Sequence, residues 1–389
     1  MINQDAIDFL RRCIEIYSPS GKEHRYSQFL GKYLREHNFE IHYDSIGNLI
    51  AEKGKGFPIL LLSSHMDTIP GKLPIKEEHG KLYGRGTVDC KSSLAAMVYS
   101  ISQYPFEQIN QGKIVFAGIV QEESSLIGIK EFIKSDIHPD FAIFGEPTSI
   151  DQLCIGYKGR LSIKYSVSTK MGHVASSWLY INAIEVCLKI WDLIKKICKS
   201  LTKNILKPQK QNTKYFDRII PNLTVISGGE LTNCIPSNAF IQVDIRYPPT
   251  ITSQTILDLL EKQIKILKQE YQTKKNLNIS IENEVSSQVE GFQIKGDDIL
   301  TGALRWAIFK VIKQKPRLIK KTGTTFINEI GSHFNIPSIT YGPGDPKLEH
   351  TEKEYIKIEE FLNSIEIYNK FFFKFFELYK KKYGENHKV

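Results

Sequence analysis

The chain has 389 residues, of which 41% are hydrophobic and 24% are charged. This length suggests two domains, each large enough to bury its own core, and the composition argues against disorder. No apolar run approaches the roughly 20 residues that span a bilayer, and residues 1–10 lack the basic-then-apolar order of a secretory signal. We therefore expect no membrane association and a cytoplasmic location.

Cysteine spacing and net charge narrow the function classes further. The six cysteines are scattered without a Cys-x-x-Cys pair, which excludes the common zinc-ribbon spacings and a disulfide framework. Reduced, mostly buried thiols are expected. The formal net charge of +9 favours acidic partners. Because the chain has no zinc finger and no RNA-recognition signature, we expect no nucleic acid, and an acidic protein or small molecule both remain open.

Short apolar runs alternate with helical stretches in the first 150 residues. Continuous apolar runs of this kind are typical of strands covered on both faces, and their alternation with helices indicates a largely parallel α/β sheet. The expected helices are at residues 6–17, 26–35, 92–104 and 127–135, and the expected strands are at 59–62, 114–120 and 141–144.

The pattern changes after residue 156. Strictly alternating strands are expected at residues 161–168, 239–246 and 277–284, with helices at 182–199 and 253–271. A β-α-β-β-α-β order would form an α+β sandwich with its helices on one face. The α/β pattern then returns, so we expect a catalytic domain at 1–156 and 287–389 with an inserted domain at 157–286. The segment 195–214 is expected to be an exposed helix extension.

The apolar run at residues 371–376 has two interpretations. A membrane anchor is one, but the run is too short to span a bilayer. A helix packed on the outer face of the sheet is therefore favoured.

Histidine and carboxylate residues follow the predicted strands, where ligands gather in an open α/β sheet. His65 ends one strand, and Asp67 can hydrogen-bond its second ring nitrogen, which strengthens the first as a metal ligand. Two glycines turn the chain before Asp89, whose carboxylate can bridge two divalent ions. The structural alternatives are a core histidine and an aspartate that caps the next helix.

Three later segments bring further ligand types. Glu122 and Glu123 follow a strand, either as a solvated pair or with one binding metal and the other handling protons. Glu146 follows the next strand, and His350 lies in a late loop. Five nitrogen and oxygen ligands without a thiolate fit two zinc ions or similar metals with positions open for water. The sequence therefore predicts a two-metal hydrolase.

The chain resembles the M20 metallopeptidase family over nearly its whole length. The resemblance implies that Asp89 bridges two zinc ions per subunit, for which cobalt can substitute. His65 and Glu146 would bind one ion, and Glu123 and His350 the other. Asp67 would orient His65, and Glu122 would be the general base. The resemblance rests on His65-Met66-Asp67, Gly84-Arg85-Gly86-Thr87-Val88-Asp89-Cys90-Lys91, Glu122-Glu123, Gly145-Glu146-Pro147-Thr148 and Glu349-His350-Thr351.

The resemblance also assigns a role to the inserted domain. It implies a ferredoxin-like lid and dimerisation domain, and hence a homodimer. His173 would serve the partner subunit's active site. Asn233 and Arg246 would contact a substrate carboxylate. Gly323 and Thr324 would lie on a loop that approaches the substrate.

One stretch narrows the substrate. Gly-Tyr-Lys-Gly-Arg-Leu at residues 156–161 is similar to the LysK branch, which releases lysine or ornithine from an acidic amino-group carrier protein in amino-acid biosynthesis. A basic enzyme suits an acidic carrier. The alternative is an acetylornithine deacetylase or succinyl-diaminopimelate desuccinylase acting on small N-acyl amino acids. A binding module without catalysis is disfavoured because all five ligands and Glu122 are present.

Overall fold

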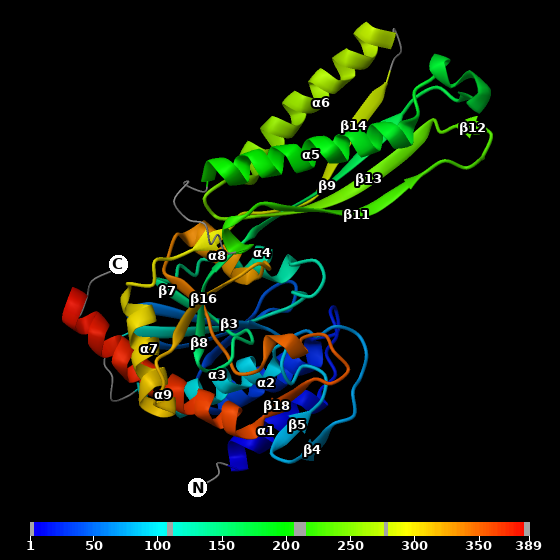
Figure 1. Cartoon of the computed structure of the whole chain (residues 1–389). Coiled ribbons are helices and arrows are strands. Elements are labelled where there is room, and N and C mark those ends of the chain that lie inside the picture. Colours follow the sequence, from blue (N-terminus) through cyan, green and yellow to red (C-terminus); the bar gives the residue numbers. More distant parts are fainter. Residues whose placement is uncertain (1–3, 107–111, 206–214, 276–278, 385–389) are drawn as a thin grey trace. The chain divides into compact units, whose positions relative to one another are not determined.

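The computed structural model describes residues 4–106, 112–205, 215–275 and 279–384 (Figure 1). The chain divides into two compact units. The first unit comprises residues 1–156, 294–320 and 325–389, and the inserted unit comprises residues 157–293 and 321–324. The expected end of the insertion at residue 286 is too early, because the last strand of the inserted unit, β14, continues to Val289.

The first unit is built on a nine-stranded sheet. Its neighbouring strands β6, β3, β7 and β17 are parallel, whereas β2 and β8 pair antiparallel with β6 and β17. The expected largely parallel centre is therefore confirmed. The strands are β1 (Glu40–Tyr43), β2 (Leu49–Lys55), β3 (Ile59–His65), β6 (Gly112–Ile119), β7 (Phe141–Phe144), β8 (Gln152–Tyr157), β16 (Arg317–Lys321) and β17 (Ser338–Thr340), together with β15 (Phe292–Gln293), whose residues fall at the boundary of the two units.

Helices cover this sheet, and the hydrophobic core of the first unit lies between the helices and the sheet. The four helices expected in the first 150 residues are confirmed, with ends displaced by up to three residues. The helices are α1 (Gln4–Glu15), α2 (His24–Glu36), α3 (Lys91–Gln103), α4 (Ile127–Phe132), α7 (Ile299–Ile312), α8 (Phe326–Phe334) and α9 (Ile358–Tyr383). A separate three-stranded sheet contains β4 (Lys76–Glu78), β5 (Lys81–Tyr83) and β18 (Tyr355–Lys357), and a short 3-10 helix spans Pro346–Leu348.

The phenylalanine run at residues 371–376 lies in α9. Phe371, Phe372 and Phe375 are fully buried, and the ring of Phe375 lies 5.1 Å from that of Phe141 in β7. The packed-helix interpretation is therefore confirmed. Among the residues that the structure describes, no helix has the length and apolar character needed to cross a membrane.

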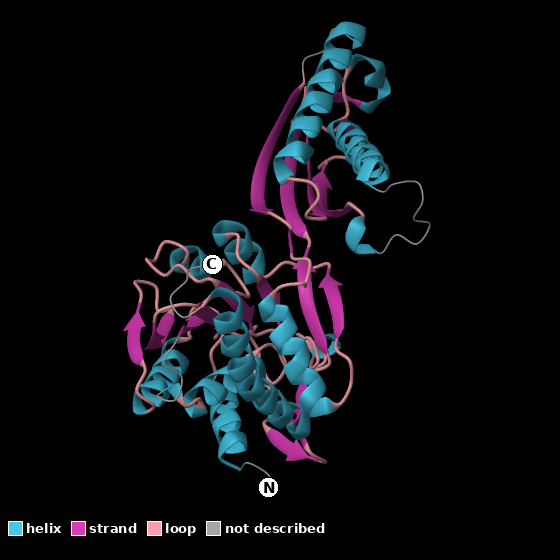
Figure 2. Ribbon diagram, turned by 90° about the vertical axis from the view of Figure 1, so that its left-hand side faces the viewer, coloured by secondary structure: helices cyan, strands magenta, loops and turns pink. Residues whose placement is uncertain are grey.

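The inserted unit has the β-α-β-β-α-β order that the sequence predicts. Its four-stranded antiparallel sheet has the order β11-β13-β9-β14, and α5 and α6 lie on one face of it (Figures 1 and 2). These elements are β9 (Gly159–Ser168), α5 (Ala183–Ile205), β11 (Ile220–Gly228), β13 (Asn238–Tyr247), α6 (Ser253–Lys275) and β14 (Ser280–Val289). The short pair β10 (Gly172–His173) and β12 (Cys234–Ile235) and the 3-10 helices Val174–Leu179 and Tyr215–Asp217 complete it.

Apolar and polar residues alternate along the strands of this sheet, which explains why only one face carries the helices. Leu161 and Ile163 of β9 and Val243 and Ile245 of β13 are buried in one core with residues of α5 and α6. The side chains between them face the other side of the sheet and are largely polar. The basic segment expected at 195–214 is helical as far as Ile205. Residues 206–214 lie outside the described part.

Replacing Phe375 by alanine tests how far the sheet depends on α9. We expect Phe375→Ala to lower the free energy of unfolding of the first unit by about 3–5 kcal/mol, because it leaves a cavity against β7. Phe373→Ala is the matched control, since that ring is 49% exposed. Urea denaturation followed by circular dichroism measures both, and equal losses would contradict the assigned core.

Candidate metal centre

Three neighbouring strands deliver the candidate ligands to one edge of the sheet. His65 is the last residue of β3, Glu122 and Glu123 follow β6, and Glu146 follows β7. These strands are parallel neighbours, so their carboxyl ends meet at the same edge, where open α/β sheets bind ligands.

The loop before α3 carries Asp89 to the same place. Gly86 has φ +86°, and a Cβ there would lie 2.9 Å from Thr68 Cγ2, so the turn requires glycine. Cys90 is the N-cap residue of α3, and the helix has no side-chain cap. The alternative that Asp89 caps this helix is therefore wrong.

The Asp89 carboxylate lies between two imidazoles. Its Oδ1 is 3.0 Å from His65 Nε2, and its Oδ2 is 3.0 Å from His350 Nε2. His350 Nε2 also lies 2.9 Å from Glu123 Oε1. Asp89 consequently belongs to two separate groups of potential metal ligands. One group is His65, Asp89, Cys90 and Glu146, and the other is Asp89, Glu123 and His350.

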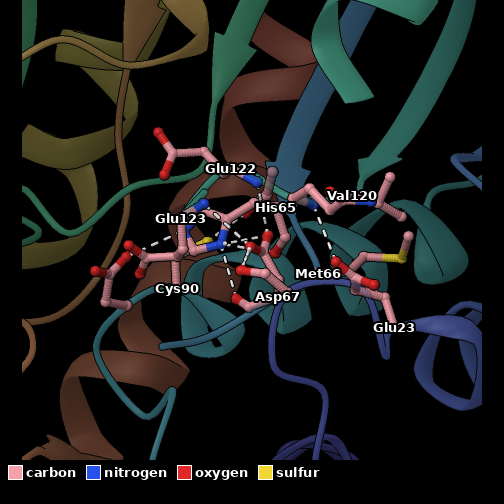
Figure 3. A network of polar contacts seen from close by, with 12 residues as sticks. Glu23, His65, Met66, Asp67, Cys90, Val120, Glu122 and Glu123 are labelled. Atoms are coloured by element: carbon pink, nitrogen blue, oxygen red, sulfur yellow. Dashed lines mark hydrogen bonds and ion pairs between the residues drawn. The ribbon is translucent and has the colours of Figure 1, made fainter. Parts of the chain in front are cut away.

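Asp67 contacts both His65 and the Glu122–Glu123 segment. The His65 ring contacts the main-chain oxygen of Asp67, with Nδ1 at 2.8 Å, and the Asp67 carboxylate is farther away at 3.5 Å. That carboxylate also accepts the main-chain N–H groups of Glu122 and Glu123, each at 3.0 Å (Figure 3). Asp67 thus orients His65 chiefly through its carbonyl and fixes the Glu122–Glu123 segment through its carboxylate.

The two glutamates have different surroundings. Glu123 faces His350, whereas the Glu122 side chain points away from the Asp67 carboxylate that binds its main chain (Figure 3). Burial, together with the neighbouring carboxylates, raises the pKa of Glu122 well above its usual value. A carboxylate with a raised pKa that lies beside the potential metal ligands is suited to accepting and returning a proton.

A cysteine joins the first group of potential ligands, which the sequence did not reveal. Cys90 Sγ lies 2.9 Å from Ser64 Oγ, and Ser64 Oγ donates to the Gly145 main-chain oxygen at 2.8 Å. Burial raises the pKa of the Cys90 thiol to about 12, so it is protonated at neutral pH. Glu146 accepts a hydrogen bond from Thr325 Oγ1 at 2.9 Å.

The charges of this cluster fit divalent cations. Hydrogen bonding to Asp89 raises the pKa of His350 to about 9, and burial raises the pKa of Glu123 to about 7. Protons on the histidines and on Glu123 therefore offset the negative charge that Asp89 and its neighbours concentrate here. Divalent cations would offset the same charge and displace those protons. The neutral tautomer of His65 with its proton on Nδ1 presents Nε2 as the ligand atom.

The remaining candidate residues belong to the inserted unit. Arg246, in β13, has its Nη1 3.5 Å from Thr324 Oγ1, and Gly323 is adjacent to Thr324. His173 and Asn233 lie together at the β10–β12 pair, where Val174 N donates to the Asn233 main-chain oxygen at 3.2 Å.

The sequence matches one known protein family over most of its length. Residues 61–374 match the model of Peptidase family M20/M25/M40. The chain belongs to this family. As an M20 protein it is a hydrolase that acts on amide bonds.

Relatives of the M20 chain match it along almost its whole length. It is 33% identical over 371 residues to a Pyrococcus furiosus protein provisionally named as a LysW-lysine/LysW-ornithine hydrolase, covering 94% of this chain and 95% of that protein. It is also 28% identical over 364 residues to the LysW-lysine/LysW-ornithine hydrolase of Sulfurisphaera tokodaii, covering 93% of each.

The fold of the M20 chain is similar to that of solved structures. A tripeptidase from Staphylococcus aureus superimposes with a TM-score of 0.78 at 21% sequence identity, covering 97% of this chain and 100% of that chain. At this identity the likeness establishes the fold alone. It confirms the expected fold class.

A buried ion pair holds two of the ligand-bearing loops of the M20 chain together. Glu354 Oε1 accepts the main-chain N–H groups of Val88 and Asp89 at 2.9 and 3.1 Å. Its Oε2 lies 2.9 Å from Arg85 Nη1, which also donates to the Thr351 main-chain oxygen at 3.1 Å. The Asp89 loop is thereby tied to the segment that follows His350. From sequence, Glu354 is one of several charged residues in a short run and gives no signal.

Glu23 forms a similar contact. Its Oε1 accepts the main-chain N–H groups of Gly21 and Gln121, each at 3.0 Å, just before the Glu122–Glu123 segment (Figure 3). The main chain that carries the ligands is therefore fixed at several points by buried carboxylates.

Substitution of Glu354 tests this anchoring. We expect Glu354→Gln to lower the affinity for zinc by about 10–100-fold, because the Asp89 loop and Arg85 lose their anionic acceptor. Glu352→Gln is the matched control, since Glu352 is exposed. Competition with a chelator measures the affinity, and circular dichroism checks that the fold is kept. Unchanged affinity in the Glu354 variant would contradict the assigned role.

Proposed function

We propose that the chain releases lysine or ornithine from an acidic amino-group carrier protein by hydrolysing an amide bond. The single observation that carries the two-metal chemistry is Asp89, whose two carboxylate oxygens face His65 and His350. The names of the Pyrococcus and Sulfurisphaera relatives support the substrate.

The proposal assigns two divalent cations, zinc or cobalt in its place, to the two groups of ligands. Asp89 is shared, with His65 and Glu146 on one side and Glu123 and His350 on the other. Nitrogen and oxygen ligands of this kind suit zinc. Bound in a pair, such cations acidify a water molecule and polarise an amide carbonyl.

Glu122 handles the proton in this reaction. Its carboxylate takes a proton from the attacking water and returns it to the nitrogen of the leaving amine. Asp67 keeps this residue in place, because it binds the Glu122 and Glu123 main chain at 3.0 Å.

The inserted unit serves as lid and dimerisation domain in this proposal. Arg246 and Asn233 contact the carboxylate of the substrate, and the loop of Gly323 and Thr324 approaches it. Arg246 suits this task because its guanidinium binds a carboxylate through two parallel hydrogen bonds. His173 serves the active site of the partner subunit, where it stabilises the negative oxygen of the transition state.

A competition assay tests the substrate. Purified protein loaded with zinc is given carrier-linked lysine together with acetylornithine or succinyl-diaminopimelate, and the released amino acids are counted. We expect release from the carrier to dominate. Preferential hydrolysis of either small substrate would favour the alternative function.

Two matched variants separate proton transfer from cation binding. We expect Glu122→Gln to keep two cations per subunit and to lose about 10²–10⁴-fold in kcat, because the proton acceptor is removed. His350→Ala should retain one cation. Metal analysis by mass spectrometry and single-turnover kinetics measure both variants. Normal turnover by the Glu122 variant would remove its assignment as general base.

An exposed edge strand provides the surface for the dimer. β11 lies at one edge of the four-stranded sheet, with Val225 and Ile226 42% and 48% exposed. An unpaired apolar edge is a template for pairing with another chain. Elsewhere in the inserted unit, the 3-10 helix Val174–Leu179 exposes the side chains of Trp178 and Leu179.

Charge placed on that edge should therefore separate the subunits. We expect Ile226→Lys to shift the protein toward monomer and to lower turnover while cation content stays the same. Val285→Lys is the control, since Val285 is 37% exposed on β14 at the opposite edge. Analytical ultracentrifugation measures the assembly, and a monomer with full activity would refute a contribution of His173 in trans.

A further inference from the structure

Two arginines face each other on the open side of the sheet in the inserted unit. Arg160 of β9 and Arg246 of β13 are directly opposite in the strand register. Like charges in directly opposite positions destabilise a sheet. Their outer neighbours in register are Val289 and Ile220, which carry no charge to compensate them.

One carboxylate is shared between the two guanidinium groups. Asp244 accepts from Arg160 Nε at 2.7 Å through Oδ2 and from Arg246 Nε at 2.6 Å through Oδ1. Asp244 fixes both arginines chiefly by their Nε atoms. Arg246 also has Nη2 3.5 Å from Asp244 Oδ2 and Nη1 3.5 Å from Thr324 Oγ1, whereas Arg160 contacts Asp244 through Nε alone. Among the described residues, the Nη groups of Arg160 have no hydrogen-bond partner.

Asp244 alone cannot neutralise both arginines. Two guanidinium groups share one carboxylate, and Lys158 lies two residues before Arg160 in the chain. Burial lowers the pKa of Lys158 to about 8; the negative charge of Asp217 opposes this lowering and the positive charge of Arg246 adds to it. A purely structural ion pair would need only one arginine to neutralise Asp244.

We propose that Arg160 and Arg246 form one anion site that holds two carboxylates of the same ligand. This rests on the proposed function: Arg246 takes the α-carboxylate of the released amino acid, and Arg160 takes a carboxylate on the acyl side of the amide. Each planar guanidinium can bind one carboxylate through two parallel hydrogen bonds.

The site therefore selects a class of substrate. Amides whose acyl group ends in a carboxylate fit this site, and the terminus of an acidic carrier protein can provide such a group. An acetyl group has no carboxylate for Arg160 to bind. Arg160 is a specificity-determining residue, and Arg246 serves all substrates with a free α-carboxylate.

Binding of two lysine derivatives tests this site. Nα-succinyl-lysine and Nα-butyryl-lysine have acyl chains of the same length, and only the succinyl group carries a carboxylate. Calorimetry with the full-length, zinc-loaded Glu122→Gln protein measures binding without turnover. We expect Arg160→Gln, added to this background, to lower the affinity for Nα-succinyl-lysine by about 10–100-fold. The affinity for Nα-butyryl-lysine should change by no more than about twofold. Arg246→Gln should weaken both.

Lys164→Gln is the matched control. Lys164 lies on the same strand and face as Arg160. Its replacement by glutamine therefore removes one positive charge and leaves Arg160 and Arg246 unchanged. An equal effect of the Lys164 and Arg160 variants would overturn the proposal, because it would indicate only long-range attraction. Equal weakening of both ligands by Arg160→Gln, no weakening of either, or no binding of either by the Arg160-intact protein would overturn it as well.

The proposed function is tested separately. If the wild-type enzyme fails to hydrolyse carrier-linked lysine while the Arg160 variants still discriminate the two derivatives, the function is wrong and the anion site stands.

Discussion

The candidate metal centre depends on one interaction, the sharing of the Asp89 carboxylate between two imidazoles. His65 comes from the end of a central strand, and His350 comes from a loop 285 positions later in the chain. A single carboxylate can face both because the Asp89 loop turns at Gly86 and enters α3 directly. All other groups of the centre are arranged around this carboxylate.

Buried carboxylates then determine how precisely that arrangement is held. Asp67 and Glu354 each accept two main-chain N–H groups from segments that carry candidate ligands, and Glu23 accepts one from the residue before Glu122. Charge-assisted bonds of this kind are stronger than bonds between neutral groups. They fix the main chain instead of the ligand side chains, so the ligand atoms remain available to cations. Catalysis by positioned charges requires such prior ordering, since a site that must rearrange loses much of its effect.

Most of the fold could be predicted from the sequence, because hydrophobic periodicity reports burial directly. The strands β3, β6 and β7 are continuously apolar because both of their faces are buried. In β9 and β13 buried and less buried residues alternate because only one face is covered by helices. The predicted ligands His65, Asp89, Glu123, Glu146 and His350 fall into the two groups for the same reason, since each follows a strand or a recognisable turn. The contacts of Asp67, Cys90, Glu354 and Arg160 could not be predicted. They depend on distances between side chains and distant main-chain atoms, and no local pattern encodes these. The exposed edge strand β11 was also missed as an individual element, because half-exposed residues give it no clear period.

The order of the chain has a consequence for how the protein is made on the ribosome. β17, which pairs with β7 in the centre of the first sheet, and α9, which covers its core, are both synthesised after the inserted unit. The inserted unit has all its strands in one stretch and can complete its core while the first sheet still lacks a central neighbour and its cover. His350 follows β17 in the chain, so a nascent chain that ends before it holds only the first of the two groups of potential ligands. The second group of potential ligands is therefore completed only after the inserted unit has been synthesised.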